Sequence, residues 1–304
     1  MQELMTYIGK EDCYGKCNKV IKKFIDVEVS EAQVYRVTDA YGKELGKTPP
    51  LERTLTPLKR DEVLYVEPDA SLLFLRKEQW KEVKVGRIFK SGDCKKAGEK
   101  PGQIAHSQYL ALLGDSATFT DQMDELIASY GPMGERLVFI SDGATWIRNW
   151  ISTSFPKSIS ILDYYHATQH LHEFANGFFR DDDAAKKWTD EQKELLLQSQ
   201  VADVIVNIQK LAPENEEAQK LINYYSANKD RMDYKRYKQI GCGIIGSGAI
   251  ESAHRTVVQK RMKLSGQRWT RKGAQNMLNL RVTDMNEQWD KVIKLAKTNF
   301  RKAA

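Results

Sequence analysis

The sequence predicts an α/β fold, with a mixed sheet flanked by helices, an all-helical insertion within it, and a small helical region before it. Three strand-like segments follow one another between residues 62 and 89, and strands then alternate with helices as far as residue 163. From residue 164 to 236 the pattern is helical throughout, with Pro213 as its clear break. Strands that give way to strand-helix alternation indicate a mixed rather than a purely parallel sheet.

Residues 1–46 form the small helical region. Ser30 and Gln33 make a capping box that predicts a helix over 31–43, and an earlier helical pattern ends near Asp26. Two helices joined by a short segment could form a helix-turn-helix DNA-binding unit with Arg36 exposed, or a plain helical hairpin. Residues 47–61 are rich in proline and charge, which predicts a linker.

Two of the expected strands have an acidic residue at or just after their end. We expect a strand over 62–70 that ends at Asp69, with 71–76 as its hairpin partner and 82–89 as a third strand. A helix is expected near 120–128. The segment RLVFI at 136–140 is a buried strand followed at once by Asp142, and a short strand follows at 158–163. The carboxyl edge of such a sheet is where ligands collect. The alternative is that Asp142 only caps the next helix.

Composition narrows the class of protein. With 304 residues, 41% hydrophobic and 29% charged, the chain is typical of globular proteins. No apolar run is long enough for a membrane span and no signal peptide is evident, so we expect a cytoplasmic protein. The four cysteines have no spacing typical of zinc sites and are expected to be free thiols. The net charge of +6 favours a polyanionic partner without establishing one.

A glycine-rich turn at 240–251 leads into a helix that carries a basic run. The turn lacks the ending of a P-loop, so it is a weak signal for nucleotide binding. Between 255 and 272 there are basic residues and no acid: Arg255, Lys260, Arg261, Lys263, Arg268, Arg271 and Lys272. With Trp269 among them, the run predicts contacts to DNA phosphates and stacking on a base. The alternative is a solvated basic face.

Three acids could meet at the edge of the sheet. Asp69 and Asp142 each follow a strand, and Glu251 opens a helix that could pack across them. Three carboxylates suit Mg²⁺ or Mn²⁺, and a pair of such ions supports phosphodiester chemistry. The alternative for Glu251 is an ion pair with Arg255, one helical turn away.

Four segments resemble the signature blocks of bacterial insertion-sequence transposases of the DDE type, in the Kra-type branch related to Mutator-like elements. They are SDGATW at 141–146, LDYYHA at 162–167, GSGAIESA at 246–253 and RMKLSGQRW at 261–269. The resemblance covers about residues 63–281. It implies an RNase H-like catalytic domain in two parts, 62–175 and 241–304, with a helical insertion at 176–240.

The resemblance also implies a site and a reaction. Asp69, Asp142 and Glu251 would be the metal-binding triad, with Asp163 and His166 in a supporting role or as a hydrogen-bonded pair that fixes the start of the insertion. Water would attack a phosphodiester at the element's end, and the freed 3′-hydroxyl would attack target DNA. Such transposases work as homo-oligomers on paired DNA ends, so DNA and further copies of the chain are the expected partners.

Two departures from the family pattern leave other functions open. The first acid stands in Pro68-Asp69-Ala70, where the family has glycine after the acid, and the chain begins late relative to full-length members. The chain could therefore be a remnant that only binds DNA, or an RNase H-like nuclease that cuts without joining strands.

Overall fold

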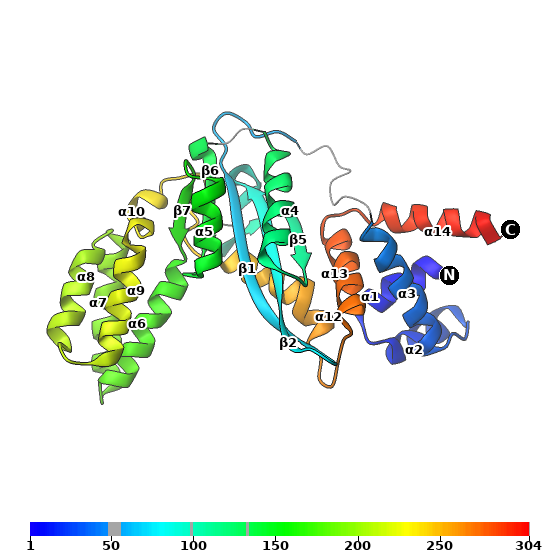
Figure 1. Ribbon diagram of the computed structural model, residues 1–304, viewed down its shortest axis with the longest axis horizontal. Helices are drawn as coiled ribbons and strands as arrows, with labels where there is room; N and C mark the ends of the chain where they lie inside the picture. Colours follow the sequence, from blue (N-terminus) through cyan, green and yellow to red (C-terminus); the bar gives the residue numbers. More distant parts are fainter. Residues whose placement is uncertain (48–55, 98–99, 132–133, 304) are drawn as a thin grey trace.

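A five-stranded mixed sheet forms the centre of the protein, as the computed structural model shows for residues 1–47, 56–97, 100–131 and 134–303 (Figure 1). In spatial order its strands are β5 (Gln108–Leu112), β2 (Gln79–Lys90), β1 (Leu64–Leu75), β6 (Leu137–Ser141) and β7 (Ile159–Leu162). β1 pairs antiparallel with β2 and parallel with β6, β2 pairs antiparallel with β5, and β6 pairs parallel with β7. This confirms the predicted mixed α/β fold.

The central strand β1 is one element of 12 residues, so the predicted division into two strands at Asp69 is wrong. Pro68 and Asp69 lie opposite Gly86 and Val85 of β2 in an unbroken antiparallel ladder. Proline has no N–H for a ladder bond. The ladder to β6 ends at Val66, before the proline is reached. Asp69 therefore lies in the middle of β1. The chain turns back into β2 only after Leu75.

Helices cover both faces of the sheet. On one face, α4 (Ser116–Ala128) and α5 (Thr145–Ser154) pack on Leu64 and Val66 of β1, which confirms the helix predicted near 120–128. Residues of the opposite parity, Tyr65 and Leu73, face the helices that follow β7. Because side chains alternate along a strand, Glu67 and Asp69 belong to this second face.

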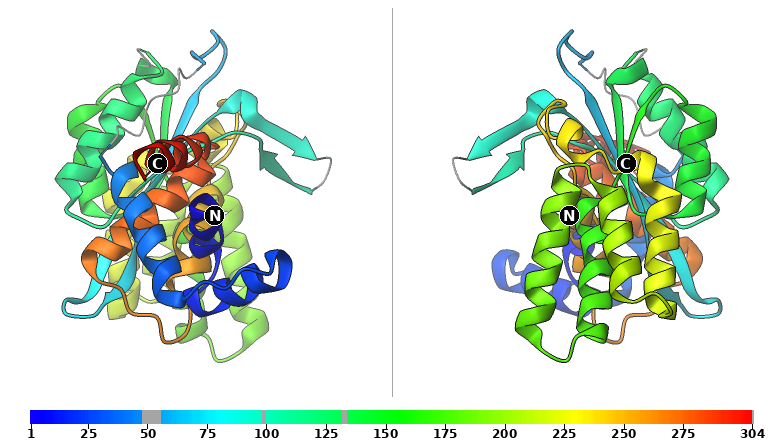
Figure 2. Two further views of the ribbon diagram at one scale, coloured as in Figure 1. Left: turned by 90° about the vertical axis from the view of Figure 1, so that its right-hand side faces the viewer. Right: turned by 90° about the vertical axis from the view of Figure 1, so that its left-hand side faces the viewer.

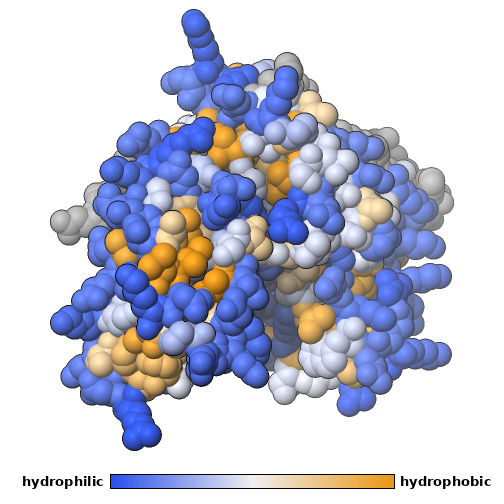
Figure 3. All heavy atoms as spheres, turned by 60° about the vertical axis from the view of Figure 1, so that its left-hand side comes forward, coloured by the Kyte–Doolittle hydropathy of each residue, from blue (hydrophilic) through white to orange (hydrophobic). Residues whose placement is uncertain are grey.

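The insertion after β7 is an all-helical layer at one end of the molecule (Figure 1). Its helices are α6 (Tyr164–Phe178), α7 (Asp182–Leu197), α8 (Val201–Leu211), α9 (Glu216–Asn228) and α10 (Tyr234–Tyr237). Residues 164–236, all described, contain only helices and turns, as predicted, and Pro213 lies between α8 and α9. The helices begin at Tyr164, as the helical pattern predicted. Seen with this end turned forward, the surface is mostly polar and is broken by apolar patches (Figure 3).

The N-terminal helices α1 (Gln2–Glu11), α2 (Tyr14–Ile25) and α3 (Glu31–Leu45) are not separate from the rest, contrary to expectation. The Ser30 side chain accepts from the Gln33 N–H, which confirms the predicted cap of α3. α3 packs against α13 (Arg271–Met285), and α14 (Asp290–Ala303) completes this end of the molecule (Figures 1 and 2). Within the predicted linker, residues 48–55 lie outside the described residues.

A small hairpin projects from the sheet (Figure 2). It consists of β3 (Cys94–Ala97) and β4 (Lys100–Ile104) and was not predicted. It lies between β2 and β5 in the chain and starts directly after the short helical turn Ser91–Asp93. Cys94 is therefore held at the base of the hairpin, next to the sheet.

Candidate active site

Asp69 lies in β1, and Asp142 directly follows β6, the parallel neighbour of β1. The ladder between β1 and β6 pairs Leu64 with Leu137 and Val66 with Phe139. Continued by three residues beyond its end, this register sets Asp69 beside Asp142, which follows β6 directly. Both acids are half-buried. By this extension of the register, two of the three predicted acids belong to the same edge of the sheet.

Asp142 does not cap α5, the alternative to a catalytic role: the N-cap residue of α5 is Ala144, without a side-chain cap bond, and Asp142 makes a local turn before it. Its Oδ1 accepts from the Ala144 N–H at 3.0 Å. From the insertion, Tyr224 packs so closely over Gly143 that a Cβ there would lie 2.9 Å from its ring. This local turn orients the carboxyl group and engages one of its oxygens, so it is compatible with a role in the site.

A buried arginine joins the ends of β6 and β7 behind Asp142. Arg231 is 8% exposed and donates to the hydroxyl groups of Ser141 at 2.8 Å and Ser160 at 3.1 Å. It comes from the short helical turn Lys229–Arg231 after α9. No sequence pattern singled it out, because its partners lie 90 and 71 residues away. Arg231 ties the insertion to the edge of the sheet where the acids lie.

Glu251 lies on α11 (Gly248–Ala253), which a second, unpredicted acid anchors to β1. Glu67 is fully buried, and its Oε2 accepts from the Ile250 N–H at 2.7 Å. Burial raises the pKa of Glu67 to about 8. Glu67 precedes Asp69 by two residues on the same face of β1, so this bond holds α11 over the face that carries Asp69. Glu251 itself is exposed.

His254, one turn after Glu251, contacts Asp69 directly. Its Nε2 lies 3.1 Å from Asp69 Oδ2, although the two groups are not aligned for a hydrogen bond. The histidine is 4% exposed and opens a π-helical stretch, His254–Gln259, that continues α11. π-Bulges of this kind are frequent at functional sites. The helix of Glu251 therefore reaches Asp69, with His254 in contact.

The three acids do not form a ready metal site. Across the described parts of the chain, no three His, Cys, Asp or Glu side chains are gathered closely enough to hold a metal ion. Carboxylates are the ligands that Mg²⁺ and Mn²⁺ take, but several must converge on one point. As they lie, Asp69, Asp142 and Glu251 do not fit the ion that the resemblance implies, and we derive no step through it.

Asp163 has a structural partner, as one of its two predicted roles required. It is 3% exposed, accepts from the Tyr165 N–H at the start of α6, and accepts from the Ser247 hydroxyl at 2.5 Å. His166 instead packs its ring 4.9 Å from that of His170. Asp163 thus joins the start of the insertion to the turn before α11, through Ser247 rather than through His166.

Two of the predicted DNA contacts are wrong because their side chains are buried. Arg261 is 1% exposed, donates to the Gly9 carbonyl at 3.0 Å and lies over the rings of Tyr14 and Trp269. Trp269 is 8% exposed and donates from Nε1 to the Met262 carbonyl at 3.0 Å. Both residues join the N-terminal helices to the core. The predicted continuous basic helix is also wrong, because α12 (Lys260–Met262) ends before a loop.

The other predicted DNA contacts, Arg255, Lys260, Lys263 and Arg268, are exposed. Lys260 pairs with Glu11 at 2.7 Å. Burial lowers the pKa of Lys263 and the charge of Asp69 opposes that shift, so this lysine lies in the electrostatic field of the first acid. Lys263 is thus the exposed basic residue that the electrostatics relate to Asp69.

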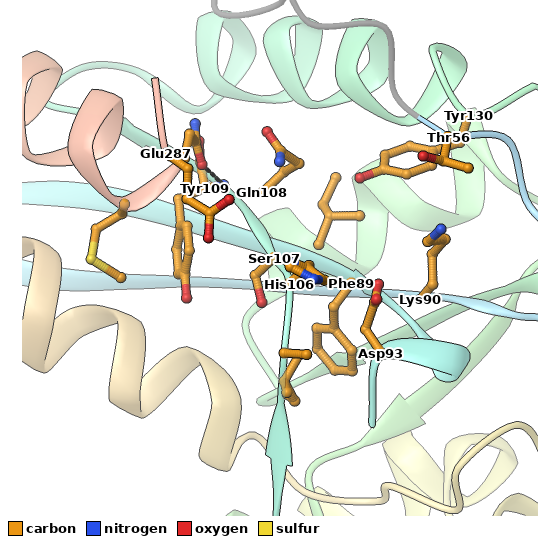
Figure 4. A pocket seen from close by; sticks show the side chains of 15 residues that line it. Thr56, Phe89, Lys90, Asp93, His106, Ser107, Gln108, Tyr109, Tyr130 and Glu287 are labelled. Atoms are coloured by element: carbon orange, nitrogen blue, oxygen red, sulfur yellow. Dashed lines mark hydrogen bonds between the residues drawn. The ribbon is translucent and has the colours of Figure 1, made fainter. Parts of the chain in front are cut away.

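A hollow of about 450 Å³ lies apart from the acids, at the far ends of β2 and β5 (Figure 4). Asp93, His106 and Tyr109 are among its lining residues, and Asn286 exchanges two hydrogen bonds with the Tyr109 backbone. None of the predicted site residues lines it.

Comparison with known proteins identifies a family without naming a function. No helix in the described ranges is long and apolar enough to cross a membrane. The "UPF0236 protein in vanSb 3'region" of Streptococcus gallolyticus is 24% identical over 267 residues, which are 83% of this chain and 54% of that relative. The chain therefore spans about half the length of this relative. Residues 11–298 match the uncharacterised protein family UPF0236, and the chain belongs to that family.

Proposed function

We propose that this chain is the catalytic portion of a DDE-type transposase, with Asp69, Asp142 and Glu251 as its reactive site. One observation carries the proposal. The register of β1 and β6, extended beyond its last pair, would set Asp69 level with Asp142, and Glu67 and His254 contact the helix of Glu251 and β1 on the face of Asp69. Three acids far apart in the sequence are thereby assigned to one edge of one sheet.

The order of elements supports the finer proposal of an RNase H-like domain. The resemblance implies a mixed sheet with flanking helices and a helical insertion between the last strand and the Glu251 helix. The chain has its insertion, α6 to α10, between β7 and α11. Asp163 and Arg231 join this insertion to the sheet beside the acids. The insertion is therefore attached to the sheet next to the proposed site.

The proposed reaction is cleavage of a phosphodiester by water at the end of a DNA element, followed by attack of the freed 3′-hydroxyl on target DNA. Mg²⁺ or Mn²⁺ is the ion that the resemblance implies, and the acids must move closer together to hold it. Arg255, Lys263 and Arg268 are the side chains we assign to the DNA backbone, and paired DNA ends would require at least a homodimer.

A second function, DNA binding without cleavage, is favoured by two observations. Nε2 of His254 lies 3.1 Å from Asp69, and a contact of this kind opposes the use of Asp69 as a ligand. Asp69, which follows Pro68, also lies within a regular strand and not in the turn that the family pattern has. A remnant of this kind would keep its basic surface and lose the chemistry. A nuclease without strand transfer would keep the chemistry and lose the joining step.

Cleavage of a labelled duplex from the flank of the chain's own gene separates these functions. The duplex is incubated with Mg²⁺ or Mn²⁺ and the native chain, Asp142→Asn, or Asp190→Asn, a control acid exposed on α7. The proposal predicts metal-dependent nicking that Asp142→Asn abolishes and Asp190→Asn retains. Salt-sensitive binding without nicking by any of the three would refute the proposal in favour of the DNA-binding remnant. Nicking without joined products would indicate the nuclease.

A further inference from the structure

Two cysteines that are far apart in the sequence meet in the fold. Cys94 begins β3 at the base of the projecting hairpin, and Cys242 lies in the glycine-rich turn after α10. They are 148 residues apart in the chain, and their sulfur atoms are 2.8 Å apart. A disulfide bond is about 2.05 Å long, so less than about 1 Å separates this contact from a bond. Both side chains are partly exposed, so a small reagent can reach them.

The two thiols are not equivalent. The hydrogen bond between the two sulfur atoms and the nearby Ile244 N–H lower the pKa of the Cys242 thiol. The same hydrogen bond to Cys242, together with burial, raises the pKa of the Cys94 thiol. The thiolate is the attacking form in disulfide exchange. Cys242 is therefore the nucleophile of the pair, and Cys94 keeps its proton until a second step.

We propose that Cys94 and Cys242 are a redox-active pair that forms an intramolecular disulfide with a small-molecule disulfide as oxidant. The Cys242 thiolate attacks one sulfur of the oxidant, and the other sulfur leaves as a thiolate. Cys94 then gives up its proton and attacks the Cys242 sulfur, which expels the second half of the oxidant. One disulfide and two protein thiols thus become one protein disulfide and two small thiols.

The bond would pin the turn that leads into α11. Gly241 and Gly243 of this turn have φ of 54° and 75°, which glycine adopts without strain. Tyr65 of β1 donates to the Ile240 carbonyl at 2.7 Å, so the turn is already held from one side. A disulfide to Cys94 would hold it from the hairpin side as well. The inference does not depend on the proposed function, because thiol chemistry can be measured without DNA.

The other two cysteines serve as an internal control. Cys17 is buried on α2, and its sulfur faces the carbonyl oxygens of Cys13 at 3.3 Å and Asp12 at 3.6 Å. Burial raises the pKa of Cys17 to about 11, so it is a poor nucleophile near neutral pH. Cys13 is one helical turn away, and its backbone carbonyl, not its thiol, is what Cys17 contacts. This pair is close in the sequence but is not arranged to react.

The experiment counts thiols in the native chain after equilibration with oxidised and reduced glutathione over a range of ratios. The chain is unfolded, its remaining thiols are alkylated, and its peptides are mapped by mass spectrometry. We expect the number of alkylated cysteines to fall from four to two, with Cys94 linked to Cys242. Cys94→Ser should accumulate one glutathione on Cys242, because the second attack is lost. Cys242→Ser should accumulate far less on Cys94.

Other outcomes overturn the proposal. Four alkylated thiols at every ratio would show that the pair does not oxidise. A link that involves Cys13 or Cys17, or one between two chains, would show that proximity in the fold does not direct the reaction. Equal glutathione adducts in the two serine variants would contradict the assignment of Cys242 as nucleophile.

Discussion

Replacing Glu67 with glutamine should change how the stability of the protein depends on pH. Glu67 is fully buried, its Oε1 has no hydrogen-bond partner, and burial raises its pKa to about 8. The amide oxygen of glutamine can still accept from the Ile250 N–H. Glu67→Gln therefore keeps the anchor of α11 and removes only the titration.

The sign and size follow from the difference between the folded and unfolded pKa values. Between pH 4.5, the ordinary pKa, and about 8, folded Glu67 is protonated while unfolded Glu67 is ionised. In this range the folded state binds more protons than the unfolded state. As the pH rises, Glu67 therefore lowers the free energy of unfolding of the native chain by about 1.4 kcal/mol per pH unit. Between pH 5 and pH 7, the free energy of unfolding of Glu67→Gln should rise by up to about 3 kcal/mol relative to that of the native chain. Near pH 4.5 the two should be nearly equal.

Urea unfolding at several pH values measures this difference. Subtracting the native curve from the Glu67→Gln curve cancels the other titrating groups, which the two proteins share. A difference that does not change between pH 5 and pH 8 would refute the reasoning. It would show that Arg87, whose charge lowers the pKa of Glu67, keeps the carboxylate ionised in the fold.

Five further substitutions test other parts of the account. Gly243→Ala should lower the free energy of unfolding by at least about 2 kcal/mol, because φ is 75° and a Cβ would lie 2.7 Å from a backbone oxygen. Gly248→Ala, with nothing within 4 Å, should change it by less than about 0.5 kcal/mol in the same urea titration. Arg231→Met should cost about 2–3 kcal/mol by the same method, because two serine hydroxyls lose their donor, and an unchanged midpoint would contradict that. Lys263→Gln should weaken DNA binding and reduce the slope of log affinity against log salt by about 0.9, as filter binding would show. Arg261→Gln should instead lower stability, and a reduced salt slope with unchanged stability would restore Arg261 to the DNA surface.

Local signals in the sequence predicted the elements well. Ser30 and Gln33 fixed the start of α3 because a cap needs only residues three apart. The run of 136–140 before Asp142 marked β6 because a buried strand is apolar throughout. The helical insertion was evident from its length and its periodicity. In each of these cases the information lies within one element.

Features that depend on distant partners were not predictable. The sequence predicted that the strand ends at Asp69, but β1 continues because Pro68, Asp69 and the residues after them stay in register with β2. Glu67 and Ile250 are 183 residues apart, and nothing local marks them as partners. Arg261 looked like a DNA contact because a basic run has the same composition whether it faces solvent or the backbone of α1. Burial of a charge is decided by tertiary packing.

The central claim is that Asp69, Asp142 and Glu251 act as one site, and the most direct test is whether their effects add. Cleavage of the flank duplex is measured for Asp69→Asn, Glu251→Gln and the double variant, with the unfolding midpoint of each as a check on folding. Residues that act as a unit are not additive. The account predicts that each single variant loses cleavage as completely as the double variant does. A Glu251→Gln variant that cuts like the native chain, or two partial losses that multiply, would contradict it.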